Sequence, residues 1–442
     1  MPRPPHVELP HQHQEFLNWA LENGVTVNHI RPAVLPGAGL GIIATSSLPP
    51  PPPPSIANGS FNLNGSDSSA PTPKRRRLSP GTTLAATPSS LLVNRDSVHR
   101  FCPRLPSSAA LTASNISTHA ILALALAIEK DNPNNFWRPW LDILPTAPEF
   151  QELLPLFWDV SEQDLLPPSA KSLLDKQTIK YALDWREIQN LLSNTPELTS
   201  TDLPEDTFKW AWAAVNTRTL YYKPETPERE SSTRDDFMTL CPFIDYFNHS
   251  STGCHVAFSH QAGYSVTLPV DTPRINENDE IFVSYGCHSN DFLLVEYGFI
   301  LPEDENRWDD LNLDPLLTPT LHPSAQTQLE EEGFWGNYTA DRNGVCYRTQ
   351  AVARMALIPM GTGFEEGLLL RWRRFLRGED AGEREQHVVD EWVRRVLAGL
   401  RGRWGEVERK VAEVGGQKGR VVEQRWMQVL RIVEGVEKGL VV

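Results

Sequence analysis

The stretch from Leu240 to Leu301 constrains the fold of this 442-residue chain more than any other part of its sequence. The run Ile281-Phe282-Val283 is β-branched and aromatic, which predicts a short buried strand. The strand is expected to end at Tyr285-Gly286, because glycine permits a sharp exit with positive φ. Apolar residues at 292–295 predict a helix that ends at Tyr297-Gly298. Both tyrosines are therefore expected at the ends of elements.

A polar pair closes another apolar run of this stretch. Asn248-His249 follows the run FIDYF at 243–247, whose composition is that of a core. A buried Asn or His costs free energy unless it is hydrogen-bonded. An isolated Asn-His pair is best explained as the cap of a turn. This pair is not isolated, because the predicted strand and helix with their tyrosines follow it.

The order of these motifs resembles that of the SET-domain protein methyltransferases. The matching residues are Asp245-x-x-Asn248-His249, then Tyr285-Gly286, then Asn290 and Leu293-Leu294 before Tyr297-Gly298-Phe299. The resemblance is greatest to the Rubisco large-subunit methyltransferase branch, which includes fungal ribosomal-protein lysine methyltransferases. It implies an α+β fold of SET type, with small β-sheets around a knot-like core, a helical inserted subdomain and a helical C-terminal domain.

The resemblance also implies a reaction and roles for single residues. The expected activity is S-adenosylmethionine-dependent N-methylation of a protein lysine, on a non-histone substrate such as a ribosomal protein. Tyr285 would be the catalytic tyrosine and would line the substrate channel, and Tyr297 would be a second catalytic residue that flanks both the channel and the cofactor. Asn248 and His249 would hold the cofactor by hydrogen bonds. Asp245 would lie near the substrate lysine.

Two upstream features acquire a meaning from the same resemblance. Gly37-Ala38-Gly39 precedes a predicted strand and by itself indicates a hairpin turn; in the family a turn here lets the backbone approach the cofactor. Many relatives carry an acidic residue before this turn, where this chain has Pro36. Arg218 lies on a predicted helix at 208–222, where an arginine is normally solvated. The pattern WA-x-x-x-V-x-x-R is similar to that of the family helix whose arginine reaches the cofactor pocket.

The predicted chemistry needs alignment more than a strong base. Methyl transfer from a sulfonium is an in-line displacement by a neutral amine. A lysine pKa of about 10.4 falls in an apolar channel, because burial disfavours the ammonium. Tyrosine suits such a site, since its ring can wall the lysine stem and its hydroxyl can orient the amine.

Composition excludes several other classes of protein. The net charge of −15 argues against nonspecific nucleic-acid binding and favours substrates with basic tails. Five scattered cysteines argue against a disulfide framework, and their spacing does not match that of a zinc site, so no metal is expected. The chain shows no apolar signal core at its start and no run long enough to span a bilayer. We therefore expect a cytoplasmic or nuclear protein without membrane contact.

The sequence divides into five segments. A first part of the SET domain is expected at 1–48, its continuation with a helical insert at 91–239, the catalytic core at 240–301 and a helical, substrate-binding C-terminal domain at 302–442. Segment 49–90 is rich in Pro, Ser, Gly, Asn and Thr, which predicts a disordered insertion. Within it, Lys74–Arg77 precedes Ser79-Pro80 and indicates either a nuclear localisation signal or a short solvated charge run.

Three functions remain open at this level. A protein-lysine methyltransferase agrees with all the motifs. A protein-histidine methyltransferase is the alternative within the same class, because this branch of the family includes one. The third is an inactive SET scaffold that binds partners. The retained tyrosines and the Asn-His pair argue against the scaffold, whereas Pro36 and the insertion leave room for it.

Overall fold

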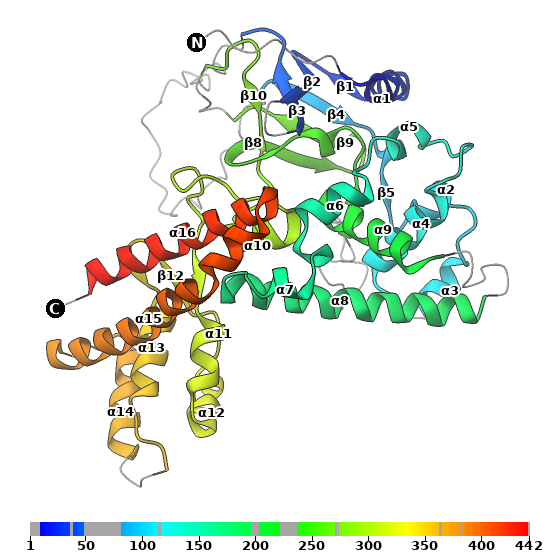
Figure 1. The fold of residues 1–442 in the computed structure, drawn as a ribbon. Helices are drawn as coiled ribbons and strands as arrows, with labels where there is room; N and C mark the ends of the chain where they lie inside the picture. Colours follow the sequence, from blue (N-terminus) through cyan, green and yellow to red (C-terminus); the bar gives the residue numbers. More distant parts are fainter. Residues whose placement is uncertain are drawn as a thin grey trace, which may run out of the picture. The chain divides into compact units, whose positions relative to one another are not determined.

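The structure of the protein is a computed structural model (Figure 1). It describes residues 9–35, 39–47, 81–113, 116–195, 203–221, 237–269, 272, 274–361, 365–379 and 382–440. The chain forms two compact units. The first comprises Met1–Leu144 and Glu187–Gly286, and the second comprises Pro145–Arg186 and Cys287–Val442. This division differs from the five consecutive segments expected from the sequence, because each unit combines two separated stretches.

The described part of the first unit contains three small antiparallel sheets. The four-stranded sheet has the order β1-β4-β9-β8, with bounds Thr26–Val27, Thr83–Thr87, Gly263–Thr267 and His249–Ser259. A second sheet has the order β10-β3-β2, with bounds Glu280–Ile281, Gly39–Ala44 and Ile30–Leu35. The third has the order β5-β7-β6, with bounds Val93–Asn94, Met238–Leu240 and Thr219–Tyr221. Small sheets combined with helices confirm the predicted α+β class.

Helices cover much of the rest of the first unit. They are α1 (His11–Glu22), α2 (Val98–Phe101), α3 (Ser108–Ala113), α4 (Thr118–Glu129), α5 (Arg138–Leu141) and α9 (Glu205–Arg218). Helix α4 begins at Ser117, whose side chain accepts a hydrogen bond from the Ala120 amide. Nearly all of α4 is buried, as its apolar composition on every side requires. It packs along α9, where the His119 ring stacks on Trp212 at a centroid distance of 4.1 Å.

The end of the predicted insertion needs correction. Residues 48–80, including Lys74–Arg77, lie outside the described residues. Strand β4, however, lies within the segment 49–90 and pairs with β1 on one side and β9 on the other. Leu84 and Ala85 are fully buried there. The composition misplaced this boundary because the segment TLAAT is short and its side chains are small. It forms a strand because it pairs with the two neighbouring strands.

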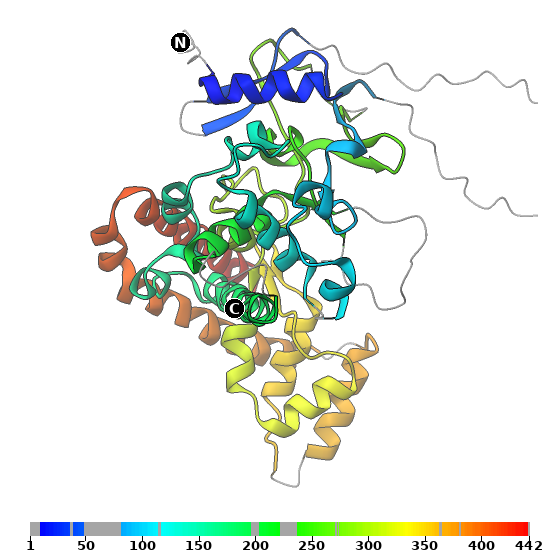
Figure 2. The same ribbon diagram turned by 90° about the vertical axis from the view of Figure 1, so that its right-hand side faces the viewer.

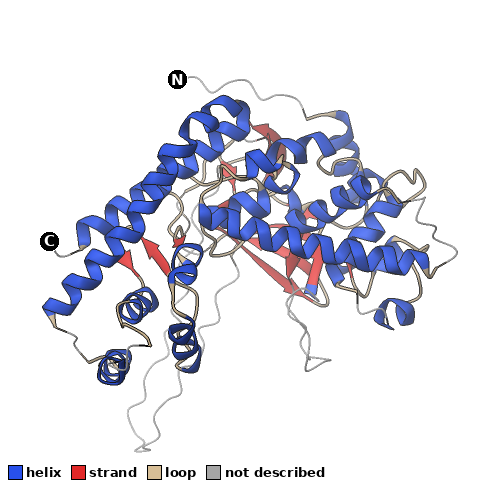
Figure 3. Cartoon of the chain, turned by 60° about the horizontal axis from the view of Figure 1, so that its bottom comes forward, coloured by secondary structure: helices blue, strands red, loops and turns tan. Residues whose placement is uncertain are grey.

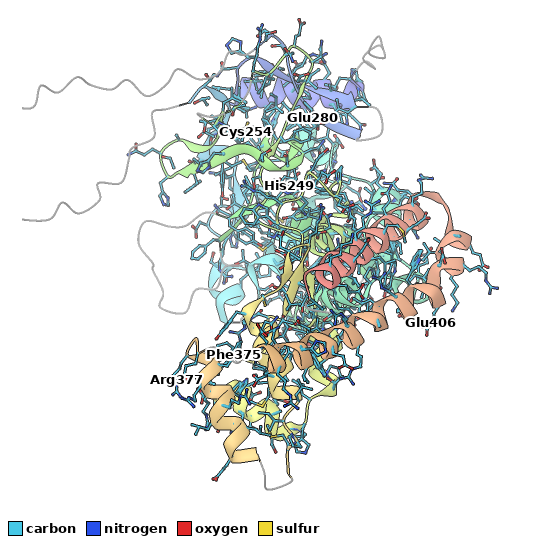
Figure 4. The ribbon with its side chains drawn as sticks, turned by 90° about the vertical axis from the view of Figure 1, so that its left-hand side faces the viewer. His249, Cys254, Glu280, Phe375, Arg377 and Glu406 are labelled. Atoms are coloured by element: carbon cyan, nitrogen blue, oxygen red, sulfur yellow. The ribbon has the colours of Figure 1, made fainter. Side chains whose placement is uncertain are left out.

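A chain crossing lies beside β8. Val283 forms parallel bridges with both His249 and Cys254, so the segment after β10 runs between two parts of the same strand. The Val283 amide donates to the Asn248 carbonyl at 2.9 Å, and the Cys254 amide donates to the Phe282 carbonyl at 2.7 Å. A Cβ at Gly253 would fall 2.4 Å from the Val283 carbonyl carbon, so only glycine admits the crossing segment. Figure 4 labels His249, Cys254 and Glu280 in this region.

The second unit is mostly helical. Its helices are α6 (Ala147–Leu153), α7 (Val160–Gln163), most of α8 (Pro168–Ser193), α10 (Asn290–Tyr297), α11 (Asp314–Leu317), α12 (Pro323–Glu331), α13 (Tyr347–Ala356), α14 (Glu365–Leu376), α15 (Glu383–Val414) and α16 (Gly416–Gly439). A small sheet has the order β11-β12-β13, with bounds Leu311–Asn312, Thr339–Asp341 and Gly344–Val345. Helices α12, α13 and α14 pack in succession (Figure 2).

The two last helices run side by side (Figure 3). Their apolar faces are buried at Val389, Val393 and Leu400 of α15 and at Trp426 and Val433 of α16. The periodic apolar residues of α15 thus pack against those of α16. No helix in the described ranges has both the length and the apolar character that crossing a bilayer requires.

Candidate active site

A strained turn presents Asp245. The residue lies on a single 3-10 turn, Ile244–Tyr246, which follows Phe243 with φ +79° and ψ −45°. This backbone conformation is costly for a residue with a side chain and persists only where packing enforces it. The Phe243 ring is fully buried, and the Tyr246 hydroxyl lies 2.7 Å from His13 Nδ1 of α1. Packing on α1 therefore holds the turn that carries Asp245.

Asp245 is bound by two residues that are distant in the sequence. Trp140 Nε1 donates to Asp245 Oδ2 at 3.0 Å. Arg218 Nη1 donates to the Asp245 carbonyl at 3.1 Å and lies 3.5 Å from Oδ2. Only 2% of the carboxylate side chain is exposed. Burial raises the pKa of Asp245, and the charge of Arg218 opposes that shift. Arg218, which was predicted near the cofactor, thus contacts Asp245, which was predicted near the substrate lysine.

Asn248 connects two strands of the second sheet. Its Nδ2 donates to the Leu40 carbonyl at 3.1 Å and to Glu280 Oε1 at 2.8 Å. Gly41 makes room for this arrangement, since a Cβ there would lie 2.9 Å from Asn248 Nδ2 and 2.8 Å from Glu280 Oε1. Burial raises the pKa of Glu280, and the Asn248 hydrogen bond opposes the rise. Sequence analysis missed Glu280; its only signal was a carboxylate at the start of a buried strand.

His249 and Tyr285 form a second pair across the crossing. The Tyr285 amide donates to His249 Nδ1 at 3.0 Å, and the two rings stack with centroids 5.0 Å apart. The Tyr285 hydroxyl donates to the Phe247 carbonyl at 2.7 Å. Burial raises the pKa of Tyr285 to about 12. The phenol is therefore neutral at physiological pH, where it acts as a hydrogen-bond donor or acceptor and not as a strong base.

Gly37, Ala38, Gly39 and Tyr297 are the remaining residues predicted for the site. Gly37 and Ala38 lie outside the described residues, whereas Gly39 begins β3 with φ +74° and has no atom within 4 Å of its missing Cβ. Tyr297 ends α10 in the second unit, with its ring between Phe292 and Phe299 at centroid distances of 6.4 and 6.2 Å. The cofactor and substrate roles of these residues stay predictions.

Asn290 belongs to a buried network in the second unit. Its Nδ2 donates to the Leu301 carbonyl and to Gln428 Oε1, both at 2.9 Å. Close by in the sequence, Asp291 accepts from Arg425 at 2.7 Å, as does Asp309. These bonds connect α10 to α16, so the motif residue Asn290 contributes to the framework. The sequence did not predict this network, because its members lie more than a hundred residues apart.

Metal binding has no support in the described ranges. No three His, Cys, Asp or Glu side chains gather there as a metal site. Burial raises the pKa of the Cys254 thiol to about 11, so this cysteine stays protonated. A protonated, buried thiol is a poor metal ligand.

The crossing, the small sheets and the motif order identify the class: the chain belongs to the SET-domain proteins, in the Rubisco and ribosomal lysine methyltransferase branch. No family model matches the chain. It is 27% identical over 336 residues to ribosomal lysine N-methyltransferase set11 of Schizosaccharomyces pombe, which covers 73% of this chain and 77% of that protein. Over 381 residues it is 25% identical to SET domain-containing protein 4 of Mus musculus, and this match covers 83% of this chain and 75% of that protein.

Solved structures show the same fold. The SET domain of LSMT bound to lysine and AdoHcy matches with a TM-score of 0.64 at 15% identity, covering 97% of this chain and 91% of that chain. Rubisco LSMT bound to AdoMet matches with a TM-score of 0.62 at 17% identity, with the same coverage.

Proposed function

We propose that this protein is an S-adenosylmethionine-dependent protein-lysine N-methyltransferase. The observation that carries the proposal is the joint placement of Asn248, His249 and Tyr285 around one chain crossing. Relatives in two yeasts bear the name of ribosomal lysine methyltransferases, and the matching solved structures hold AdoMet or AdoHcy. An inactive scaffold would not need a neutral, buried phenol next to a buried carboxylate.

The residues around Asn248 fit the cofactor. Gly39 leaves open space at the start of β3, and Arg218 Nε is a buried donor with no hydrogen-bond partner among the described residues. Asn248, His249 and Gly39 would hold S-adenosylmethionine, as the sequence also predicts for Gly37 and Ala38. When bound, the cofactor supplies an electrophilic methyl group on a sulfonium sulfur.

The chain's own residues align and dehydrate the substrate amine. The Tyr285 hydroxyl is fixed by its bond to the Phe247 carbonyl, so its oxygen is positioned to accept from the amine. The apolar residues of the crossing exclude water, which favours the neutral amine over the ammonium. Asp245 offers a carboxylate whose position is set by Arg218.

For the substrate, we propose a basic ribosomal protein. The support is the name of the yeast relatives and the net charge of −15, which attracts basic chains.

Cofactor binding and product analysis test this function. Calorimetry should show binding of S-adenosylmethionine to the full chain. Asn248→Ala should weaken that binding about tenfold, because it removes the side chain that joins Leu40 to Glu280 at the proposed cofactor site. Asn134→Ala, an exposed asparagine of the same unit, is the matched control. Labelled S-adenosylmethionine and a cell extract should then yield methyl-lysine, identified by mass spectrometry. Absence of cofactor binding in the wild type would indicate a scaffold, and methyl-histidine would replace the lysine assignment.

A further inference from the structure

Trp140 contributes a hydrogen bond to the proposed site from a helix outside the motif region. Its side chain, on α5, is fully buried, and the ring packs edge-on against Phe101 at a centroid distance of 6.3 Å. Trp140 belongs to none of the motifs found in the sequence. The structure adds that its indole Nε1 lies 3.0 Å from Asp245 Oδ2.

The two oxygens of Asp245 have different surroundings. Oδ2 faces Trp140 Nε1 at 3.0 Å and Arg218 Nη1 at 3.5 Å. Oδ1 is buried and has no hydrogen-bond partner among the described residues. A buried carboxylate oxygen without a donor is costly. Asp245 Oδ1 therefore lacks one hydrogen-bond donor, and the N–H of a substrate amine can supply it.

Other charged and titratable groups near Asp245 do not provide that donor role. Arg218 is the cation that faces it, and its Nη1 is used on the carbonyl and on Oδ2. Burial raises the pKa values of Cys241, Tyr246 and Tyr285, so all three stay neutral beside the carboxylate. The Tyr246 and Tyr285 hydroxyls already bond His13 and the Phe247 carbonyl.

We propose that Trp140 is a positioning residue for the substrate amine: by binding Oδ2 it orients the Asp245 carboxylate so that Oδ1 accepts a hydrogen bond from the lysine side chain. The inference rests on the proposed methyltransferase function. It assigns α5 a part in substrate alignment, with Trp140 acting through Asp245 and not on the reacting atoms. Because charge-assisted hydrogen bonds are directional, loss of the indole N–H lets the carboxylate rotate away from the amine.

The chain offers a matched control for this hypothesis. Trp137 lies three residues earlier, is 3% exposed, and also packs edge-on against Phe101, at 5.5 Å. Its Nε1 donates to the Leu91 carbonyl at 3.1 Å, and not to Asp245. Trp137→Phe and Trp140→Phe therefore remove the same ring atoms and one indole hydrogen bond each from one aromatic cluster. Only Trp140→Phe removes the bond to Asp245.

Transfer of labelled methyl groups to extract proteins tests the two variants, with cofactor affinity and melting temperature measured alongside. Trp140→Phe should lower the transfer rate about 10- to 100-fold, while Trp137→Phe stays within about threefold of wild type. Affinity for S-adenosylmethionine should change less than twofold in both. Addition of Asp245→Asn to Trp140→Phe should cause little further loss, because the two residues act as a unit.

The pH profile adds a readout that a purely structural role would not change. The Trp140 bond lowers the pKa of Asp245, so its removal should move the acid limb of the rate profile to higher pH. The inference would be overturned by equal rate losses in the two Trp→Phe variants. It would also be overturned if the rate losses of Trp140→Phe and Asp245→Asn were additive. The proposed function would still stand in either case, provided that the wild type binds S-adenosylmethionine. If Trp140→Phe folds poorly, Trp140→Tyr and Trp137→Tyr form a second pair under the same criteria.

Discussion

At the scale of single residues, the site depends on side chains that are fixed by backbone groups. Tyr285 is held at both ends, since its amide binds His249 and its hydroxyl binds the Phe247 carbonyl. Asn248 donates to the backbone carbonyl of Leu40 and to the side-chain carboxylate of Glu280. Such bonds orient a side chain before any ligand arrives, which is what a reaction limited by alignment requires.

Tyr285→Phe is the sharpest test at this scale. The change removes one oxygen and keeps the ring that stacks on His249. The rate of methyl transfer should fall about a hundredfold, as for loss of one well-placed polar group in a dry site, with nearly unchanged cofactor affinity. Rate, number of methyl groups added, affinity and melting temperature should be measured together.

The control for that variant is Tyr338→Phe. Tyr338 is fully buried in the second unit, and its hydroxyl has no hydrogen-bond partner among the described residues. Its loss should leave the rate unchanged. A wild-type rate and product pattern in Tyr285→Phe would remove the catalytic assignment.

At the scale of elements, the site exists because one segment crosses another without a side chain between them. Gly253 is the contact point, with β8 on one side and the residues after β10 on the other. The crossing aligns Asn248 and His249 with Tyr285. The crossing leaves no room for a side chain at Gly253.

Gly253→Ala should therefore destabilise the protein severely. The added methyl group would overlap the backbone at Val283, and backbone cannot rotate away as a side chain can. We expect a loss of about 3 kcal/mol or more in the free energy of unfolding. Gly402→Ala provides the opposite control, because this glycine lies inside α15 with nothing within 4 Å and should gain about 0.5–1 kcal/mol. Urea denaturation of both variants measures the contrast; a stable Gly253→Ala protein contradicts the steric argument.

In the second unit, Asp310 is expected to make the stability of the folded protein depend on pH. Asp310 is half-buried beside Asp309 and Asp291, opposite Arg425. Burial first, and then the neighbouring carboxylates, raise its pKa from 3.8 to about 6. Because the folded state binds the proton more tightly, the stabilising contribution is fully present below pH 3.8 and is lost as pH rises through about 6.

Asp310→Asn should remove that loss. The amide cannot ionise, so the variant should equal the wild type only below pH 3.8. Its advantage should be smaller at pH 5 than at pH 8, where it should reach on the order of 1 kcal/mol after allowance for partial exposure. Asp304→Asn is the control, since that side chain is 96% exposed and should show no pH-dependent difference. Denaturation curves at pH 5 and pH 8 give both values. An identical difference at the two pH values would show that Asp310 does not titrate in this range.

At the scale of the whole molecule, the four-stranded sheet of the first unit combines strands from distant parts of the chain. Strand β4, just after the Pro/Ser-rich stretch, lies between β1 and β9 in the four-stranded sheet. The stretch therefore begins and ends beside ordered strands. Its composition predicts that it contributes no core of its own.

Two deletions separate the stretch from the strand. Replacing 49–78 with a flexible Gly-Ser linker of about 12 residues, which spans roughly 20 Å on average, should leave stability and methyl transfer near wild type. Removing 49–90 deletes β4 and should abolish folding. Melting curves and transfer assays of both proteins decide the matter. A severe loss in the shorter deletion would assign the stretch a role in the fold or the site.

The sequence by itself determined the elements and motifs that depend on neighbours along the chain. The helix ending at Gly298 and the apolar faces of α15 and α16 follow from local periodicity and from glycine's freedom at positive φ. The strand predicted at 281–283 is shorter, since β10 ends at Ile281 and Val283 forms only isolated bridges. The order of the motifs also determined the class of protein.

Tertiary structure alone decided which of these residues meet. Trp140 binds Asp245 across 105 residues, and Asn248 binds Glu280 across 32. Strand β4 is ordered only because β1 and β9 flank it. Local propensity reports what a segment prefers within a turn or two, whereas these contacts depend on the path of the whole chain. The Asp245 carboxylate at the proposed site is therefore bound by an indole from a helix that lies outside every motif of the sequence.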